Sequence, residues 1–387
     1  MVKNIVILGS TGSIGQNALR VIDALGAGFK VLALSANSKV ELLAQQVKKY
    51  KPSVVAVTNC DYAEKFRGLV GNSDVEILSG PESLTQIAQL DEADIVLAAV
   101  VGAVGLGAVL AAAKKGKTLA IANKEPLVIA GQLLTETAKR YKSKILPVDS
   151  EHSAIFQVMQ AGRAEEVNRI IITSSGGPFR EMSVEDIENV TLEQALSHPV
   201  WNMGPKITID SATMMNKALE VIEARWLFDT AVDKIEVLIH PESIVHSLVE
   251  FVDGSVIAQM GTPDMCLPIQ YALTYPKRVK GITKHLRLAE LGKLTFEKPR
   301  LEIFKALPLG YEVARTGGTA AAVFNAANEA AVQEFLAGRI RFVRIIELIE
   351  HCLNKHKVDT EASLDELLAA DAWARNEVLE CLRQKVH

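Results

Sequence analysis

Carboxylate side chains occur at two places in this chain where they could share one metal ion. Residues 145–148 form an apolar run that predicts a buried strand, and Asp149 and Glu151 follow it directly. Open α/β sheets keep their ligands at the carboxyl ends of strands, and side chains two residues apart in an extended chain face the same side. With Glu220 they would form an all-oxygen site, which suits Mg²⁺ or Mn²⁺ better than Zn²⁺. The alternative is that Asp149 only caps a helix that starts near His152.

Polar side chains around the second place could bind a phosphorylated substrate. Residues 198–226 read HPVWNMGPKITIDSATMMNKALEVIEARW, in which Asn216 and Lys217 lie four and three residues before Glu220. On a helix, side chains at these spacings lie on one face. A cation, an amide and a carboxylate that converge there suit a phosphorylated, metal-bound substrate. The alternative is a solvated helix with an ordinary exposed Lys–Glu pair.

The helix that would carry these side chains has a periodic apolar face. We expect its N-cap at Asp210 or Ser211, because both side chains can accept hydrogen bonds from the first helical amides. The apolar residues at helical spacing are Met215, Leu219, Ile222 and Trp226. This pattern predicts a helix with one buried face.

The beginning of the chain predicts a nucleotide-binding turn. An apolar run at residues 5–8 leads into Gly9, Gly12 and Gly15, and a helical pattern follows them. This G-x-x-G-x-x-G spacing is a variant of the dinucleotide fingerprint. Glycines allow a tight turn and a close approach of the pyrophosphate, while the helix amides offer an anion site.

The end of the next predicted strand indicates which nicotinamide is used. A site for NAD usually places Asp or Glu there, to bind the ribose 2′-hydroxyl. Here residues 30–34 lead into Asn37, Ser38 and Lys39, and no acidic residue occurs before Glu41. Because Ser38 and Lys39 could donate hydrogen bonds to a 2′-phosphate, we expect NADPH. The alternative is that Ser38 merely caps the following helix.

A loop rich in serine and glycine offers a further anion site. Residues 173–178, TSSGGP, follow a predicted strand and carry hydroxyls and open backbone amides. A plain turn is the alternative. Between this loop and the predicted helix, residues 179–205 could form a lid over a ligand, with Trp201 and Met203 as its apolar residues. Trp201 could instead belong to the core.

The eight histidines of the chain receive different interpretations. His198 could contact a phosphate or the substrate, because it directly precedes the lid residues. We expect the remaining histidines to be structural, including His240 and His246, since nothing beside these two completes a site.

Composition favours an intracellular enzyme. Hydrophobic residues make up 49% of the 387 residues and charged residues 23%, and the net charge of −4 gives no basic field for nucleic acid. The four cysteines show no metal-binding spacing, so we expect reduced core thiols. A strand begins almost at once, which leaves no room for a signal peptide, and no apolar run has the length of a membrane span. We expect a cytoplasmic protein with no membrane partner.

Three regions follow one another along the chain. Short apolar runs alternate with helical patterns up to residue 149, which predicts a doubly wound parallel sheet of the Rossmann-like α/β class. Its strands are expected at residues 5–8, 31–34, 54–57, 75–78, 95–100, 118–122 and 145–148. Residues 150–286 predict a central α+β domain, with strands at 170–173, 235–239, 244–252 and 255–260 and a hairpin turn at Asp253 and Gly254. After a linker at 287–310, residues 311–387 predict a C-terminal helical domain.

Five motifs together resemble one enzyme family. GSTGSIG, NKEPLV, PVDSEHSAIFQ, SSGGPFR and HPVWNMGPKITIDSATMMNKALEVIEARWLF look like the 1-deoxy-D-xylulose 5-phosphate reductoisomerases, over essentially the whole chain. The resemblance implies an NADPH domain at residues 1–149, a catalytic and dimerisation domain with a lid at about 179–205, a helical C-terminal domain and a homodimer. It implies NADPH and Mg²⁺ or Mn²⁺ as cofactors, with Co²⁺ as a further option, and a small phosphorylated sugar as substrate.

The resemblance also assigns roles to individual residues. The implied metal ligands are Asp149, Glu151 and Glu220, which with Lys124 form the implied catalytic set. The implied substrate contacts are Lys124, Ser150, Glu151, Ser175, His198, Ser211, Asn216, Lys217 and Glu220. The implied cofactor contacts are Thr11, Gly12, Ser13, Ile14, Asn123, Glu125 and Gly204, with Asn37 and Ser38 added at the adenosine end. There the chain departs from the Gly-Lys-Asn type sequence that family members often show.

The family reaction explains why metal, substrate and cofactor contacts would occur together. A divalent ion that polarises the substrate's carbonyl would help to break and remake a carbon–carbon bond, and NADPH would reduce the resulting aldehyde to 2-C-methyl-D-erythritol 4-phosphate. Two other interpretations remain: a metal-assisted NADP-dependent dehydrogenase for a phosphorylated hydroxy acid, and a non-catalytic NADP(H) sensor. The dehydrogenase would form a product without rearranging the carbon skeleton, so product analysis separates it from the reductoisomerase. The sensor would bind the nucleotide without metal-dependent turnover.

Overall fold

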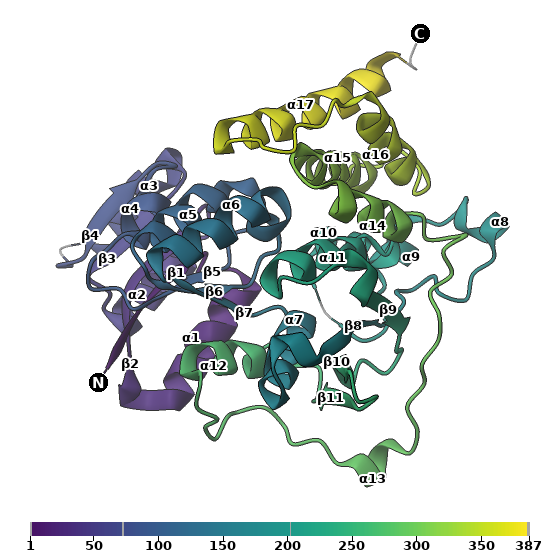
Figure 1. Ribbon diagram of the computed structural model, residues 1–387. Coiled ribbons are helices and arrows are strands. Elements are labelled where there is room, and N and C mark those ends of the chain that lie inside the picture. Colours follow the sequence, from purple (N-terminus) through teal and green to yellow (C-terminus); the bar gives the residue numbers. More distant parts are fainter. Residues whose placement is uncertain (1, 72, 202, 385–387) are drawn as a thin grey trace. The chain divides into compact units, whose positions relative to one another are not determined.

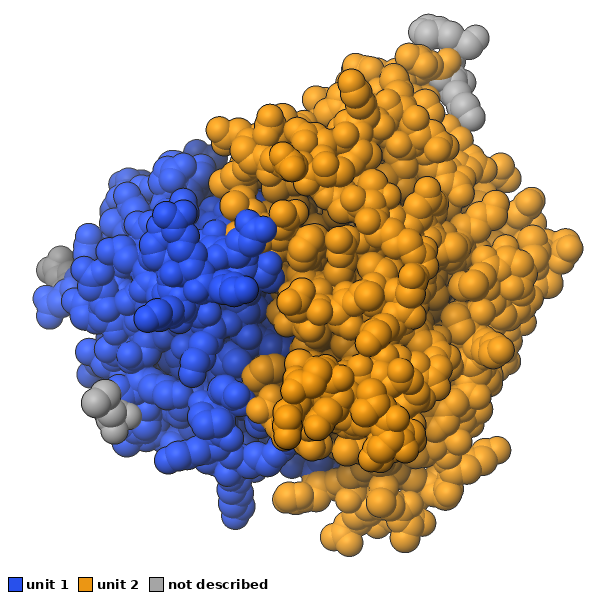
Figure 2. Space-filling model, in the orientation of Figure 1, with its two compact units in different colours: residues 1–126, 134–153, 264–284 blue, residues 127–133, 154–263, 285–387 orange. Residues whose placement is uncertain are grey.

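The computed structural model describes residues 2–71, 73–201 and 203–384, which form two compact units (Figures 1 and 2). Unit 1 contains residues 1–126, 134–153 and 264–284, and unit 2 contains residues 127–133, 154–263 and 285–387. Neither unit is one continuous stretch of chain. No helix in the described part of the chain is long and apolar enough to cross a membrane.

Unit 1 is built on a seven-stranded parallel sheet whose strand order is β4-β3-β2-β1-β5-β6-β7. The strands are β1 (Lys3–Leu8), β2 (Phe29–Ala36), β3 (Val54–Val57), β4 (Glu76–Ser79), β5 (Ile95–Ala98), β6 (Thr118–Ile121) and β7 (Lys144–Pro147). The order reverses between β1 and β5, and doubly wound sheets bind ligands at such a switch point. The predicted doubly wound sheet is confirmed.

Helices connect these strands and cover the sheet (Figure 1). Those that lie within unit 1 are α1 (Ser13–Leu25), α2 (Val40–Tyr50), α3 (Cys60–Val70), α4 (Ser83–Ala88), α5 (Leu106–Lys114) and α12 (Cys266–Thr274). The helices α6 (Glu125–Tyr141) and α7 (Ser150–Val158) lie partly in unit 2. The strands β3 and β5 are apolar throughout, because both faces of a parallel sheet are buried: all four residues of each strand are buried. The α12 helix comes from far along the chain and packs against α1.

Unit 2 contains a four-stranded sheet of order β11-β10-β8-β9. Its strands are β8 (Val167–Ser174), β9 (Ile235–Ile239), β10 (Val245–Phe251) and β11 (Val256–Met260). The β8 and β9 strands are parallel, whereas β10 is antiparallel to both β8 and β11. Gly254 has a φ of 86° in the β10–β11 turn, and the predicted hairpin at this place is confirmed.

The remaining helices of unit 2 include the helical tail that the sequence predicts. They are α8 (Val184–Ile187), α9 (Leu192–Leu196), α10 (Pro205–Ala212), α11 (Met215–Leu227), α13 (Leu288–Leu291), α14 (Ala306–Thr316), α15 (Thr319–Leu336), α16 (Arg344–Lys355) and α17 (Leu364–Arg383). The α14 helix packs on α11, and α15 packs on both α16 and α17. In Figure 1 the tail from α14 to α17 is drawn from green to yellow.

The cysteines only partly agree with the sequence prediction. All four are free thiols, as expected, and Cys266 and Cys352 are buried. Cys60, however, is exposed at the first residue of α3, and Cys381 is half-buried. The prediction that they are core thiols is therefore wrong for Cys60.

Candidate functional site

The glycine turn after β1 is shaped so that only glycine fits at two of its positions. Gly9 has a φ of 85°, and its backbone amide donates to Ser35 Oγ at 2.8 Å. A Cβ atom at Gly9 would lie 2.6 Å from the carbonyl oxygen of Ala99, and one at Gly15 would lie 2.4 Å from the Gly9 oxygen. The Ser35 hydroxyl was not recognised in the sequence, because it lies on the neighbouring strand β2.

The α1 helix begins at this turn without a side-chain cap. Gly12 is its N-cap residue and offers no side chain to the first amides of the helix. Uncapped amides at a helix N-terminus form an anion site. The predicted pyrophosphate contacts all lie at this place: Thr11, Gly12, Ser13 and Ile14.

The predicted contacts for the adenosine end are at the surface after β2. Asn37 and Ser38 are both exposed, and the Thr58 hydroxyl donates to Asn37 Oδ1 at 3.1 Å. The residue at the N-cap of α2 is Lys39, and no side chain caps this helix. The alternative that Ser38 serves as a helix cap is therefore wrong.

The neighbouring strands β6 and β7 place a lysine beside an aspartate. Lys124 Nζ lies 2.9 Å from Asp149 Oδ2, and both side chains are about seven-eighths buried, with 13% and 14% exposed. The other oxygen of Asp149 accepts from the Glu151 amide at 3.2 Å and lies 3.2 Å from His152 Nδ1. Ser150 donates to Glu151 Oε2 at 2.8 Å. Asp149 thus caps the first turn of α7 and pairs with a cation, so the capping alternative is correct but incomplete.

Two further predicted cofactor contacts flank Lys124. Asn123 is half-buried, and Glu125 is buried at the first residue of α6. A carboxylate at this end of a helix is stabilised by the helix dipole. Gly204, the third such contact, is the N-cap residue of α10 and precedes Pro205.

The helix predicted to start at Asp210 or Ser211 is broken into two helices. Both residues lie inside α10, and Met214 then takes a φ of 61° before α11 begins. The N-cap prediction is therefore wrong. The N-cap residue of α11 is Met214, and the Thr213 hydroxyl before it accepts a hydrogen bond from the Met215 amide at 3.3 Å.

Asp210 has a structural partner far along the chain. Its carboxylate is buried, lies 2.8 Å from Lys206 Nζ and accepts a hydrogen bond of 2.9 Å from Asn328 Nδ2. This contact connects α10 to α15.

The cluster on α11 is buried. Lys217 Nζ lies 2.6 Å from Glu220 Oε2, with only 7% and 0% of the two side chains exposed, and Asn216 donates to the other oxygen of Glu220. The alternative of a solvated helix with an exposed pair is therefore wrong. A charged pair this deeply buried costs desolvation energy, which favours a functional over a purely stabilising purpose.

The serine–glycine loop lies against the junction between α10 and α11. Gly176 and Gly177 have φ values of 83° and 70°. A Cβ atom at Gly177 would lie 2.7 Å from the carbonyl oxygen of Ser211. The loop therefore brings Gly177, two residues after Ser175, against the Ser211 backbone.

His198 is held in one tautomer. Its Nδ1 accepts from the backbone amides of Val200 and Trp201, at 3.1 and 2.9 Å. Its proton therefore lies on Nε2, which is 3.0 Å from Ser175 Oγ. Burial lowers the pKa of His198, which favours the neutral ring. Trp201 is half-buried, and residue 202 of the predicted lid lies outside the described residues.

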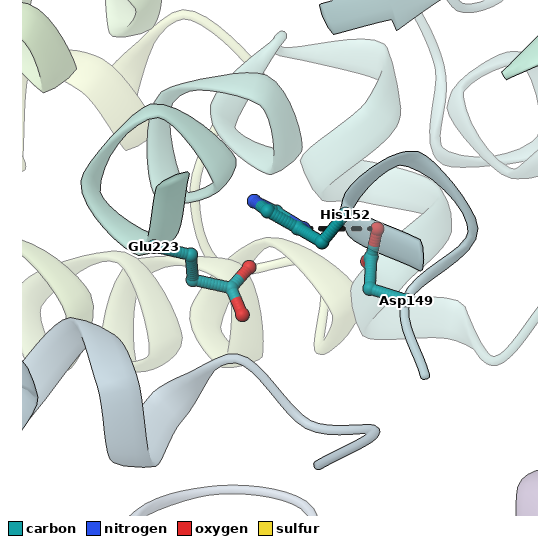
Figure 3. A group of neighbouring side chains, drawn as sticks. All are labelled: Asp149, His152 and Glu223. Atoms are coloured by element: carbon teal, nitrogen blue, oxygen red, sulfur yellow. Dashed lines mark hydrogen bonds and ion pairs between the residues drawn. The ribbon is translucent and has the colours of Figure 1, made fainter. Parts of the chain in front are cut away.

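Two sets of described side chains are of the kind that could hold a metal ion. The first consists of the three predicted carboxylates, Asp149, Glu151 and Glu220. The second consists of Asp149, His152 and Glu223, and Figure 3 shows it with the His152–Asp149 interaction dashed. His152 and Glu223 were not among the predicted ligands, although each lies three residues after one of them. Three carboxylates favour a hard ion such as Mg²⁺, whereas an imidazole favours transition metals.

His240 and His246, which the sequence predicts to be structural, are both buried. His240 is fully buried; its Nδ1 lies 2.8 Å from the carbonyl oxygen of Thr295, and its Nε2 accepts from the amides of Ile244 and Val245. These backbone contacts agree with a structural role. His246 is buried on β10.

Comparison with known proteins gives one family along the whole chain. Residues 5–131 match the family model for 1-deoxy-D-xylulose 5-phosphate reductoisomerase, residues 145–228 match its C-terminal domain, and residues 260–377 match the DXP reductoisomerase C-terminal domain. A curated relative from Pelotomaculum thermopropionicum, named 1-deoxy-D-xylulose 5-phosphate reductoisomerase, is 50% identical over 382 residues, which covers 98% of this chain and 99% of the relative.

Solved structures agree with the family models. The Zymomonas mobilis reductoisomerase in complex with NADPH is 41% identical, with a TM-score of 0.93 and 99% of each chain covered. A DOX-P reductoisomerase in complex with NADPH, fosmidomycin and magnesium is 40% identical, with a TM-score of 0.94 and coverage of 99% of this chain and 98% of that one.

Proposed function

Since this chain belongs to the 1-deoxy-D-xylulose 5-phosphate reductoisomerase family, we propose that the residues after β7 and those at the start of α11 carry its reaction. The enzyme rearranges 1-deoxy-D-xylulose 5-phosphate and reduces it to 2-C-methyl-D-erythritol 4-phosphate, with NADPH and a divalent metal ion. The observation that best supports this assignment of residues is the fully buried carboxylate of Glu220, between Lys217 and Asn216.

Asp149, Glu151 and Glu220 would hold the divalent ion. Their donor atoms are all carboxylate oxygens, which suit Mg²⁺ or Mn²⁺, and Co²⁺ is a further option. When bound, the ion polarises the substrate's carbonyl oxygen and NADPH supplies the hydride. Lys124 and His152 would hold the Asp149 carboxylate in one orientation, because each contacts a different oxygen of it.

Lys124 has a second use in this proposal. Its ammonium could stabilise negative charge that develops on a substrate oxygen, since it is mostly buried and already aimed at the carboxylate group. Ser150, which donates to Glu151, would lie beside the reacting carbons.

Five side chains around the α10–α11 junction would bind the substrate. Lys217 supplies a cation, and the neutral His198 ring can donate from Nε2 to a phosphate oxygen in place of Ser175. A clamp on the phosphate keeps the two parts of the substrate together while a carbon–carbon bond is remade. The proposed contacts are Ser175, His198, Ser211, Asn216 and Lys217.

NADPH would lie at the switch point of the parallel sheet. Its pyrophosphate would contact the uncapped start of α1, at Thr11, Gly12, Ser13 and Ile14. The exposed side chains of Asn37 and Ser38 would contact the adenosine end without a carboxylate to repel a 2′-phosphate. The remaining proposed contacts are Asn123, Glu125 and Gly204.

The functional organisation follows from the same proposal. Residues 1–149 would bind NADPH, residues 150–286 would carry catalysis with a lid at about 179–205, and residues 287–310 would link them to the helical residues 311–387.

We also propose a homodimer. The strand β11 lies at the edge of its sheet, and its Val256 and Ile257 are 48% and 39% exposed. Four free thiols agree with a cytoplasmic location.

A matched pair of variants tests the metal site. Glu220→Gln should abolish metal-dependent NADPH oxidation with 1-deoxy-D-xylulose 5-phosphate, because it removes one carboxylate charge from the proposed ligand set. Glu223 is also buried and lies one turn further along α11, and Glu223→Gln should retain metal-dependent NADPH oxidation. Oxidation is followed by absorbance, with Mg²⁺ and then with chelator, and the product is identified by mass spectrometry. Both variants should bind NADPH as wild type does.

Two outcomes would contradict the assignment. Full activity in Glu220→Gln would exclude Glu220 as a ligand. Loss of activity in Glu223→Gln alone would instead favour the set that contains His152.

A further inference from the structure

A cavity in unit 2 shares no lining residue with the proposed metal, substrate or NADPH contacts, although its α8 wall belongs to the proposed lid at about 179–205. Its volume is about 220 Å³. It lies between α8, the segment before α14, and one face of α16. Its apolar lining consists of Val184, Ile187, Ile303, Phe304, Phe342, Val343 and Ile346. We call it the α8–α16 cavity.

The floor and the mouth of the α8–α16 cavity differ in exposure. Phe304, Phe342 and Ile187 are buried, with 4%, 5% and 7% of their surface exposed, and form an apolar floor. Val184 is 47% exposed at the mouth. A concave apolar surface with a few polar groups at its edge is the usual form of a small-molecule site.

Carboxylates dominate the charge at the mouth. Four glutamates and one lysine belong to the lining: Glu188, Glu302, Glu347, Glu350 and Lys305. Arg300 pairs with Glu302 at 3.1 Å, and Arg344 pairs with Glu347 at 2.5 Å, so two of the four carboxylates are neutralised.

The other two carboxylates are available to a ligand. Among residues 2–71, 73–201 and 203–384, neither Glu188 nor Glu350 has an ion-pair partner. Lys305 offsets one of these charges, which leaves the lining with the net charge of one carboxylate. The cavity is therefore complementary to a ligand with one positive charge and an apolar body.

The two carboxylates approach the cavity from different elements. Val343, the N-cap residue of α16, lies on one face with Ile346 and Glu350, because the three are spaced by three and four residues. On the opposite wall, Glu188 directly follows α8, four residues after Val184. A cation at the mouth could contact both carboxylates while its apolar part lies on the phenylalanine floor.

We propose that the α8–α16 cavity binds a small organic cation, in which one ammonium group is attached to an aromatic or aliphatic body. The ammonium lies between Glu188 and Glu350, and the apolar body fills the space above Phe304 and Phe342. This site is separate from the proposed substrate and NADPH contacts, so its ligand does not need to resemble either.

Calorimetric titration of the whole protein with tryptamine tests the proposal. Tryptamine carries an ammonium group on an indole ring, and 3-ethylindole is its uncharged counterpart. We expect tryptamine to bind with a dissociation constant on the order of 1 mM, as is typical of a ligand this small. The uncharged compound should bind more weakly. Equal binding of both, or no binding of tryptamine, would overturn the proposal.

Variants then locate the binding. The double variant Glu188→Gln, Glu350→Gln should weaken tryptamine about two- to fivefold, the range for partly exposed ion pairs. The control Glu185→Gln, on α8 but outside the lining, should leave it unchanged. Ile346→Trp should fill the cavity and abolish binding. Wild-type affinity in both the double variant and Ile346→Trp would place the ligand elsewhere and refute the site.

Discussion

The contact between α11 and α14 predicts how a single methyl group at Gly310 would affect the protein. Gly310 lies in α14, and a Cβ atom there would lie 2.5 Å from the Cβ of Ala218 and 2.7 Å from its Cα. It would also lie 3.0 Å from the Ala218 carbonyl oxygen. Because two of these three atoms are backbone, no side-chain rotation can relieve the overlap. Gly310→Ala therefore forces the two helices apart.

The size of the effect follows from two opposing contributions. Replacing glycine by alanine inside a helix stabilises it by about 1 kcal/mol. Overpacking costs roughly 1–3 kcal/mol, and contact with backbone favours the upper end of this range. The net loss in the free energy of unfolding should be about 2 kcal/mol. For a unit of roughly 150–250 residues, this lowers the midpoint of thermal unfolding by roughly 4–8 °C.

Gly68 provides the matched control. It lies inside α3, and a Cβ atom there would have no neighbour within 4 Å. Gly68→Ala should therefore raise stability by about 1 kcal/mol. Both variants are compared by circular dichroism at the same heating rate.

Two results would refute this reasoning. If Gly310→Ala and Gly68→Ala raise the midpoint by equal amounts, α11 and α14 do not approach as closely as the structure indicates. If Gly310→Ala leaves the midpoint at its wild-type value, the overlap with Ala218 does not carry the predicted cost. Substrate KM provides a second measure, since α11 also carries Lys217 and Glu220.

Three further predictions concern single groups. Lys217→Ala should raise the KM for 1-deoxy-D-xylulose 5-phosphate roughly 10- to 100-fold, from the loss of a charged hydrogen bond, and an unchanged KM in steady-state kinetics would place the phosphate elsewhere. Burial lowers the pKa of His198, so the unfolded state binds more protons and the free energy of unfolding should rise with pH between the folded-state pKa and about 6.5. Urea unfolding at several pH values should show a weaker dependence of this free energy on pH in His198→Gln. Exposed Cys60 should react with iodoacetamide at pH 8, while Cys266 and Cys352 should react only after unfolding, because burial raises their pKa values to about 11 and about 12. Mass spectrometry of the labelled peptides checks this order, and reaction of Cys352 first would contradict it.

The parallel sheet could be predicted because each of its strands leaves a local signal. Apolar runs such as residues 54–57 are short, lie between turns and need no distant partner to be recognised. The glycine turn is also local, because the φ of 85° at Gly9 favours glycine whatever packs against the turn. Both features therefore appear in the sequence as well as in the structure.

The break between α10 and α11 could not be predicted in the same way. Met214 takes a positive φ, which methionine rarely adopts, and nothing in its neighbours signals it. Burial of Lys217 and Glu220 depends on the distant elements that pack over them. The periodicity of the helix does not show what covers its polar face. The partner of Asp210 is Asn328, 118 residues away. Such long-range contacts leave no trace in a local pattern.

The packing of α12 on α1 has a consequence for how the protein is made. The ribosome must synthesise residues 264–284 before α1 can be covered, so unit 1 remains incomplete while about half of unit 2 is being translated. In the finished unit, Lys3 Nζ donates to the carbonyl oxygen of Leu273 at 3.1 Å, which ties the first strand to a segment made much later. A gene fragment that ends at residue 149 would therefore encode a sheet with one helix missing. Nascent chains of this length should depend on chaperones until α12 leaves the exit tunnel.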